Sequence, residues 1–241
     1  MGGYWNTKYY PAPNAEDIRN NAEESTRKAK RKGIVYQPVI IEGRKIAKSW
    51  WGNAWCENLE RYADFASRIE RGRRYVRNGS VIDLQISKGK VTARVQGRRK
   101  SPYKIEIRIS PLSEEKCTAV LERCGKKPDT LEALVSGDFP EELKELFFQE
   151  DGLFPAPMEI SFSCSCPDWA LMCKHVAAAL YGIGARFDEN PLLFFELRGI
   201  DVDRFIDTAI HDRIEDMLSM ADNRTSRMLD DQDLTGLFGV L

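Results

Sequence analysis

Four residues of the types that bind transition metals lie within twelve positions of one another. Cys164 and Cys166 are separated by one residue, six residues follow, and Cys173 and His175 are again separated by one residue. Three thiolates and one imidazole form a complete tetrahedral ligand set for Zn²⁺. Structural zinc sites fill all four positions with protein ligands, whereas catalytic zinc keeps one position open. The spacing therefore predicts one structural zinc ion, with scattered buried thiols or a redox pair as the alternatives.

The local pattern predicts the elements that position these four residues. Residues 158–163 alternate like a short strand, Pro167 stiffens the turn that follows, and a helix is expected over 174–183. Cys173 and His175 then lie at the start of that helix, where the helix dipole favours a thiolate.

The ligand pattern, with a strand before it and a helix after it, resembles the SWIM zinc finger. The likeness extends to residues 50–55 (WWGNAW), 71–79 (RGRRYVRNG) and 180–186 (LYGIGAR), which look like the bacterial and archaeal SWIM-protein family. The resemblance implies a small zinc-binding companion of Swi/Snf-type helicases that binds DNA or protein and has no enzymatic activity. All four ligand positions match, while the polar N-terminal stretch and the acidic C-terminal half depart from the family.

The remaining cysteines and the second histidine have no comparable spacing. Cys56 falls in a tryptophan-rich helix, and Cys117 and Cys124 are seven residues apart on another predicted helix. We expect all three to be small buried hydrophobic residues. His211 has no second ligand at useful spacing and is expected to be a surface or core histidine.

Positive charge is concentrated in the first half of the chain. The net charge is −1, but residues 1–110 have 24 Lys and Arg against 11 Asp and Glu, and residues 111–241 have 12 against 26. Arginine binds phosphate through two parallel hydrogen bonds. A nucleic-acid surface is therefore predicted, made of Arg71, Arg73, Arg74, Arg77, Arg94, Arg98, Arg99, Lys100 and Lys104. A solvated sheet face, or contact with the chain's own acidic half, would explain the same charges.

Hydrophobic periodicity indicates an α+β fold. Residues 50–62 have the spacing of an amphipathic helix, and alternation from residue 81 to 109 predicts three antiparallel strands on which that helix packs. Tyr75 and Tyr103 either stack on bases or anchor this sheet. The later part is predicted to be mostly helical, with a buried helix face made of Val202, Phe205, Ile206, Ala209, Ile214, Met217 and Leu218. Its helices are expected near residues 114–124, 129–135, 141–149, 190–199 and 203–221.

Four parts follow from these patterns. They are a loosely ordered N-terminal segment (1–49), a basic helix-plus-sheet domain (50–112), an acidic helical region (113–200) with the SWIM finger at about 158–185, and a C-terminal helix and tail (201–241). The acidic and then apolar residues 229–241 are expected to dock on the chain's own core or on a partner.

Composition limits the function further. The chain has 241 residues, 42% of them hydrophobic, and no run that approaches the roughly 20 apolar residues of a membrane span, so we expect a folded cytoplasmic protein. We predict a non-enzymatic zinc-binding adaptor for nucleic acid, with DNA favoured, and for a Swi/Snf-type helicase. The alternative is a pure protein-interaction subunit of such a helicase complex. A nuclease is disfavoured because no paired acidic motif, phosphate-binding glycine loop or activated nucleophile is found, and no small-molecule substrate is expected.

Overall fold

The computed structural model describes residues 14–125, except 63 and 65, and residues 144–148 and 152–201. It also describes residues 203, 207, 210, 211, 214, 215 and 217–219 of a later helical segment. The chain divides into two units, Met1–Ile200 and Asp201–Leu241.

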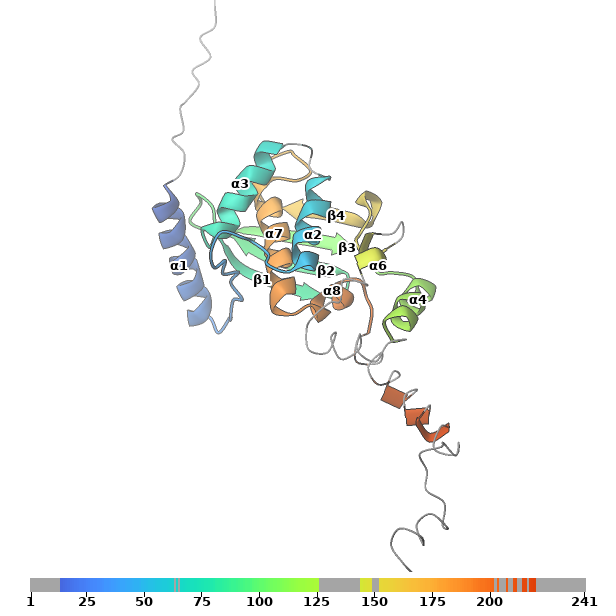
Figure 1. Cartoon of the computed structure of the whole chain (residues 1–241). Helices are drawn as coiled ribbons and strands as arrows, with labels where there is room; N and C mark the ends of the chain where they lie inside the picture. The colour runs from blue at the N-terminus through green and yellow to red at the C-terminus, as the bar shows by residue number, and fades with distance from the viewer. Residues whose placement is uncertain are drawn as a thin grey trace, which may run out of the picture. The chain divides into compact units, whose positions relative to one another are not determined.

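The first unit is an α+β fold built on a four-stranded antiparallel sheet (Figure 1). Its strands, in sheet order, are β1 (Val81–Ser87), β2 (Lys90–Val95), β3 (Tyr103–Ile109) and β4 (Ile160–Cys164). The prediction of three strands is therefore wrong. The short strand expected before the cysteines joins the same sheet, because β4 pairs with β3 and places Cys164 opposite Ile105.

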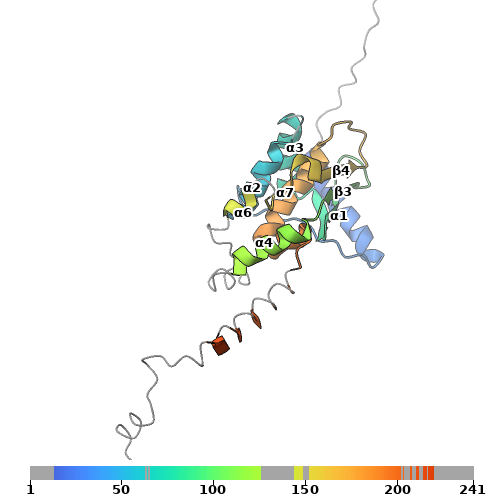
Figure 2. The ribbon, with the colours of Figure 1, turned by 90° about the vertical axis from the view of Figure 1, so that its right-hand side faces the viewer.

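The helical elements of this unit are α1 (Ala15–Arg31), α2 (Trp50–Glu60), α3 (Ala66–Arg77), α4 (Glu114–Gly125), α6 (Lys144–Phe148), the 3-10 turn η2 (Pro157–Glu159), α7 (Lys174–Glu189) and α8 (Leu192–Leu197). Helices α7, α2 and α3 cover one face of this sheet in two layers (Figures 1 and 2). Helix α7 lies on the strands, and α2 and α3 pack on α7. Helix α7 thus occupies the place that we expected for the tryptophan-rich helix α2.

Two buried tryptophans connect α2 to α7 and α8. The indole N–H of Trp55 donates to the Leu180 carbonyl over 3.0 Å, and that of Trp51 donates to the Phe187 carbonyl over 3.0 Å. The Trp55 ring also meets the Phe187 and Phe194 rings edge to face. The predicted periodic face of this helix is confirmed as a core face.

Helices α3 and α7 approach each other closely at Gly72. A Cβ atom added there would lie 2.5 Å from Cβ of Ala177 and 3.0 Å from the backbone nitrogen of Ala178. The absence of a side chain at this position therefore sets the distance between the helices that flank the cysteine and histidine cluster.

Gly72→Ala is expected to destabilise the protein by about 1–3 kcal/mol, because the helix backbone cannot accommodate the added methyl group. Helix propensity alone would give the opposite sign, a gain of about 1 kcal/mol. Urea unfolding measures the difference, with Ser67→Ala at an exposed position of the same helix as the control. A more stable Gly72→Ala variant would contradict the close contact.

The N-terminal segment is better ordered than we expected. Residues Ala15–Arg31 form α1, which buries Ile18, Ala22 and Ala29 on one face. The Ser25 hydroxyl on the same face donates to the Gln96 side-chain oxygen over 2.8 Å. Small residues at helical spacing are sufficient to pack α1, so a helix with few large apolar residues can still be ordered here. Residues 1–13 lie outside the described part.

The extended segment after α1 runs along the edge of β1. The Val39 N–H donates to the Val81 carbonyl over 3.0 Å, and the Leu84 N–H donates to the Gln37 carbonyl over 2.9 Å. This segment therefore supplies backbone hydrogen bonds to the edge of β1 that is not paired with β2.

Helix α4 matches the predicted segment 114–124 to within one residue, and α6 falls within the predicted segment 141–149. The predicted helix 129–135 lies outside the described residues. In the second unit, the described residues between 203 and 219 are helical. Three residues of the predicted buried face are exposed, Ile214 to 50%, Met217 to 66% and Leu218 to 64%. Its other residues, Val202, Phe205, Ile206 and Ala209, lie outside the described residues. The predicted docking tail 229–241 is outside the described residues.

Among the residues that the structure describes, no helix is both long and apolar enough to cross a membrane.

Candidate metal centre

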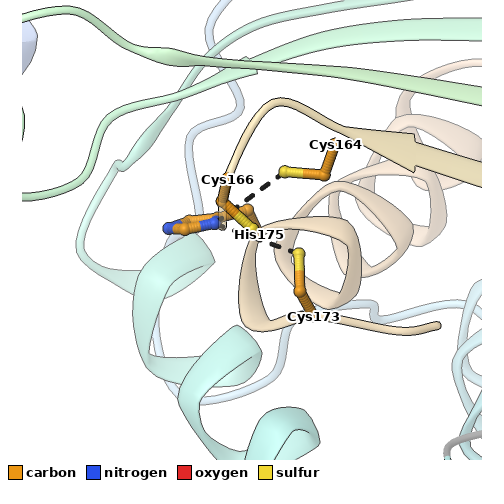
Figure 3. Close-up of side chains that lie close together, drawn as sticks. All are labelled: Cys164, Cys166, Cys173 and His175. Atoms are coloured by element: carbon orange, nitrogen blue, oxygen red, sulfur yellow. Dashed lines mark hydrogen bonds between the residues drawn. The ribbon is translucent and has the colours of Figure 1, made fainter. Parts of the chain in front are cut away.

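The four residues singled out by their spacing lie together where β4 ends and α7 begins (Figure 3). Cys164 is the last residue of β4, Cys166 follows in the turn, Cys173 is the N-cap of α7 and His175 lies in its first turn. Their ligand atoms are all within 4.8 Å of one another. The cluster could hold a metal ion.

The distances within the cluster suit a tetrahedral site. Nδ1 of His175 lies 4.0 Å from Sγ of Cys164 and 3.9 Å from Sγ of Cys173. A tetrahedron with Zn–S bonds of about 2.3 Å and a Zn–N bond of about 2.1 Å has edges of roughly 3.6–3.8 Å. The two His175 distances exceed such edges by a few tenths of an ångström, and the widest spread of 4.8 Å exceeds them by about 1 Å, so the cluster would contract to close around zinc. Its thiolate-rich donor set suits a soft or borderline ion.

Cys173 is the thiol of the cluster that ionises first. A hydrogen bond from the Cys164 thiol is the main cause that lowers the pKa of Cys173 to about 4, and His175 and the Val176 backbone N–H add to it, while burial opposes the shift. The pKa of Cys164 is raised, first because its thiol donates to Cys173 and then because it is buried. The start of α7 thus holds one negative sulfur ready for a cation.

His175 is presented to the cysteines through Nδ1 and is enclosed on its other side. The residue is 1% exposed, and its ring stacks on Tyr103 at 4.0 Å between centroids and meets Tyr75 edge to face at 5.4 Å. Burial lowers the pKa of His175, which favours the neutral imidazole that a metal requires. The two tyrosines therefore position the candidate ligand rather than stand open for bases.

Gly97 completes this enclosure. A Cβ atom at Gly97 would lie 2.7 Å from Cε2 of Tyr103 and 3.4 Å from Nε2 of His175. The backbone connecting β2 and β3 can therefore lie directly over the stacked rings, which brings the basic residues that follow Gly97 close to the cluster.

The loop between the second and third cysteines is held at both ends. The guanidinium of Arg68 pairs with the Asp168 carboxylate at 3.1 Å, and the Leu171 N–H donates to the Asp64 carboxylate over 3.0 Å. Before the loop, the Lys104 N–H donates to the Ser165 hydroxyl over 2.9 Å. Sequence reasoning missed Arg68 and Asp64, because partners about one hundred residues apart leave no local signal.

The nine predicted nucleic-acid residues do not share one sheet face. Arg71, Arg73, Arg74 and Arg77 lie on α3, Arg94 and Lys104 lie on β2 and β3, and Arg98, Arg99 and Lys100 lie in the connection between these strands. The alternation that predicted the strands could not show that the first four residues belong to a helix packed on α7.

Several of these cations have structural partners. Arg73 pairs with Glu60 and donates to the Tyr181 hydroxyl over 2.7 Å. Arg77 donates to the Arg44 carbonyl over 3.0 Å. Two further ion pairs are Arg74 with Glu70 at 3.3 Å and Arg94 with Asp83 at 3.5 Å.

A smaller group of exposed cations lies beside the cluster. Arg71, Arg98 and Arg99 are exposed, and the Arg99 guanidinium lies 5.4 Å from the centroid of the Tyr103 ring that stacks on His175. Burial raises the pKa of Tyr75, and the positive charges of Arg98 and Arg71 act against that shift. Lys100 and Lys104 are exposed on the same connection and at the start of β3.

The other cysteines and His211 take no part in the cluster. Cys56 is buried in α2, and burial raises its thiol pKa to about 12, as expected of a core cysteine. Cys117 is half-buried in α4, the side chain of Cys124 lies outside the described part, and His211 lies 3.4 Å from Glu215 on an exposed helix face.

Comparisons with known proteins give one relative. The chain is 38% identical over 156 residues to the uncharacterized protein Rv2102 of Mycobacterium tuberculosis, which corresponds to 64% of this chain and 56% of the relative. The chain therefore spans little more than half the length of the curated relative that it matches. No family model matches the chain, and no solved structure matches it.

Proposed function

We propose that this protein is a non-enzymatic adaptor of the SWIM type, in which one structural Zn²⁺ supports a nucleic-acid surface. Cys164, Cys166, Cys173 and His175 would hold the ion. Exposed cations beside the cluster, above all Arg71, Arg98 and Arg99, would bind the phosphates of DNA or RNA, with DNA favoured. The observation that carries the proposal is that the Arg99 guanidinium lies over Tyr103, the ring that stacks on the candidate ligand His175.

The donor set supports a structural role for the ion. Four protein ligands would complete a tetrahedron and leave no position for water or a substrate. The ion would join the end of β4 to the start of α7, and these elements belong to the sheet and to the helix that covers it. Such a site contributes to folding directly, since the bound state requires the folded ligands.

The charge beside the cluster supports a polyanion partner. Guanidinium groups form paired, charge-assisted hydrogen bonds with phosphate, and contacts of this kind give salt-dependent binding that is largely independent of sequence. In the reducing cytoplasm, which we propose as the compartment, the cysteines would bind metal rather than form disulfides. A Swi/Snf-type helicase is the partner that the family resemblance suggests.

The double variant Arg98→Glu/Arg99→Glu is expected to weaken binding to single strands and duplexes alike. The salt dependence of log K should flatten by roughly one unit of slope for each lost phosphate contact. Fluorescence anisotropy with labelled oligonucleotides at several salt concentrations measures both effects. Zinc content should stay unchanged, because neither residue is a ligand.

Lys88→Glu/Arg108→Glu is the matched control. It changes the net charge equally, but Lys88 and Arg108 lie at the opposite end of the strands, by the turn between β1 and β2. Equal losses of affinity in both double variants would show that binding depends on overall charge and not on the cations beside the cluster. A wild-type protein that binds neither DNA nor RNA at low salt would favour the pure protein-interaction subunit instead.

A further inference from the structure

The loop between the metal-binding pairs, residues 167–172, presents large apolar side chains to solvent. Trp169 is 82% exposed and Leu171 is 79% exposed, whereas Ala170 and Met172 between and after them are buried. This strict alternation points two apolar side chains outward while the loop keeps its own anchors inside. Large exposed apolar groups on such a short loop indicate a contact surface.

The loop is not free to fold these side chains away. The Asp168 carboxylate accepts hydrogen bonds from the Arg68 guanidinium at 3.3 Å and from the Ala170 N–H at 3.4 Å, and the Leu171 N–H is held by Asp64. The loop is therefore held by hydrogen bonds on both sides of Trp169. A loop whose backbone is already held in place loses little conformational entropy when it binds a ligand.

Cations line the path from this loop to the cluster. Arg68, Arg71 and Tyr75 are spaced i, i+3 and i+7 on α3, so they lie on one face of the helix. Arg68 contacts the loop and Tyr75 contacts His175, which leaves exposed Arg71 between the two. The rise of an α-helix puts the ends of this row roughly 10 Å apart. Exposed Arg98 lies beside the same rings, between Gly97, whose backbone lies against Tyr103 and His175, and Arg99, whose guanidinium lies over Tyr103.

We propose that Trp169 is a stacking platform for an unpaired base of single-stranded nucleic acid, whose phosphates follow Arg71 and Arg98. This inference rests on the proposed nucleic-acid function and specifies that the nucleic acid is single-stranded. In a duplex both faces of each base are covered by its neighbours, whereas an unpaired base can lie flat on an exposed aromatic ring. Exposed Arg71, one helical turn from the Arg68 that holds the loop, matches a phosphate backbone, which is why we favour a nucleic acid over the apolar pocket of a protein.

The test compares wild type, Trp169→Ala and Trp169→Phe in binding to a labelled 12-nucleotide single strand and to the corresponding duplex. Trp169→Ala is expected to weaken single-strand binding about tenfold or more and to change duplex binding little. Trp169→Phe should keep most of the affinity, since a smaller ring can still stack. Zinc content and melting temperature should match wild type, because the side chain is largely exposed.

A backbone without bases provides the second measurement. An abasic oligonucleotide of equal length should bind to wild type and Trp169→Ala equally, since only the phosphate contacts remain. Equal single-strand affinity of wild type and Trp169→Ala would overturn the inference, even if the Arg98→Glu/Arg99→Glu variant still lost binding and so upheld the proposed function. A loss restricted to association with a protein partner, with nucleic-acid binding intact, would also overturn it. If wild type bound no nucleic acid, both proposals would fall.

Discussion

Cys173→Ala is expected to lose the metal and the ordered structure of residues 158–185. Cys173 is the buried N-cap of α7 and the thiol with the lowest pKa of the cluster. Zinc binding in structural sites contributes on the order of 10 kcal/mol, and a whole domain of this kind is stable by only about 5–15 kcal/mol. Elemental analysis and thermal unfolding followed by circular dichroism measure the two losses.

Two variants keep this prediction testable if Cys173→Ala fails to fold. Cys117→Ala makes the same chemical change at a half-buried cysteine outside the cluster and should retain both zinc and stability. His175→Cys replaces one zinc ligand with another and should retain the ion, because four cysteines also form a closed site. Full metal content in Cys173→Ala, or an unchanged melting temperature after the metal is removed from wild type, would contradict the proposed centre.

Arg198→Met is expected to destabilise the protein by about 3 kcal/mol without removing the zinc. The Arg198 side chain is 1% exposed, donates to the Ser110 carbonyl over 2.7 Å and pairs with the Glu159 carboxylate at 3.0 Å. It thus joins the end of α8 to the end of β3 and the start of β4. Removal of one partner from a buried pair is costly because the remaining charge loses its compensation. The carboxylate is 29% exposed, so partial rehydration puts the expected value at the lower end of the usual range.

The control for this prediction is an arginine with an exposed partner. Arg74→Met breaks the pair with Glu70 on the surface of α3, and exposed pairs of this kind contribute only about 0–0.5 kcal/mol. Guanidinium chloride unfolding compares the two variants. Equal free energies of unfolding for Arg198→Met and Arg74→Met would show that the buried pair does not hold these elements together.

The sequence predicts the candidate ligands well because their spacing is local. Cys164, Cys166, Cys173 and His175 fall on one strand end, one turn and one helix start, and each of these elements has its own signal in the neighbouring residues. The strands from residue 81 to 109 are also predicted, since a tight turn joins the first two and alternation marks all three.

Contacts between distant segments could not be predicted in this way. The pairing of Ile105 with Cys164 makes the strand before the cysteines the fourth strand of the sheet, and nothing near either residue indicates it. The same limit applies to the charges. Lys and Arg counts cannot distinguish Arg73, which is paired with Glu60 in the fold, from exposed Arg98 beside the candidate metal centre.

X-ray absorption at the zinc edge, on protein purified without added metal, tests the proposed centre most directly. The predicted result is one zinc ion per chain with three sulfur neighbours at about 2.3 Å and a single light neighbour at about 2.0–2.1 Å that shows the outer-shell scattering of an imidazole ring. Those neighbours would be the three cysteines and Nδ1 of His175. A second light neighbour, fewer than three sulfurs, or no bound zinc would contradict a closed structural site.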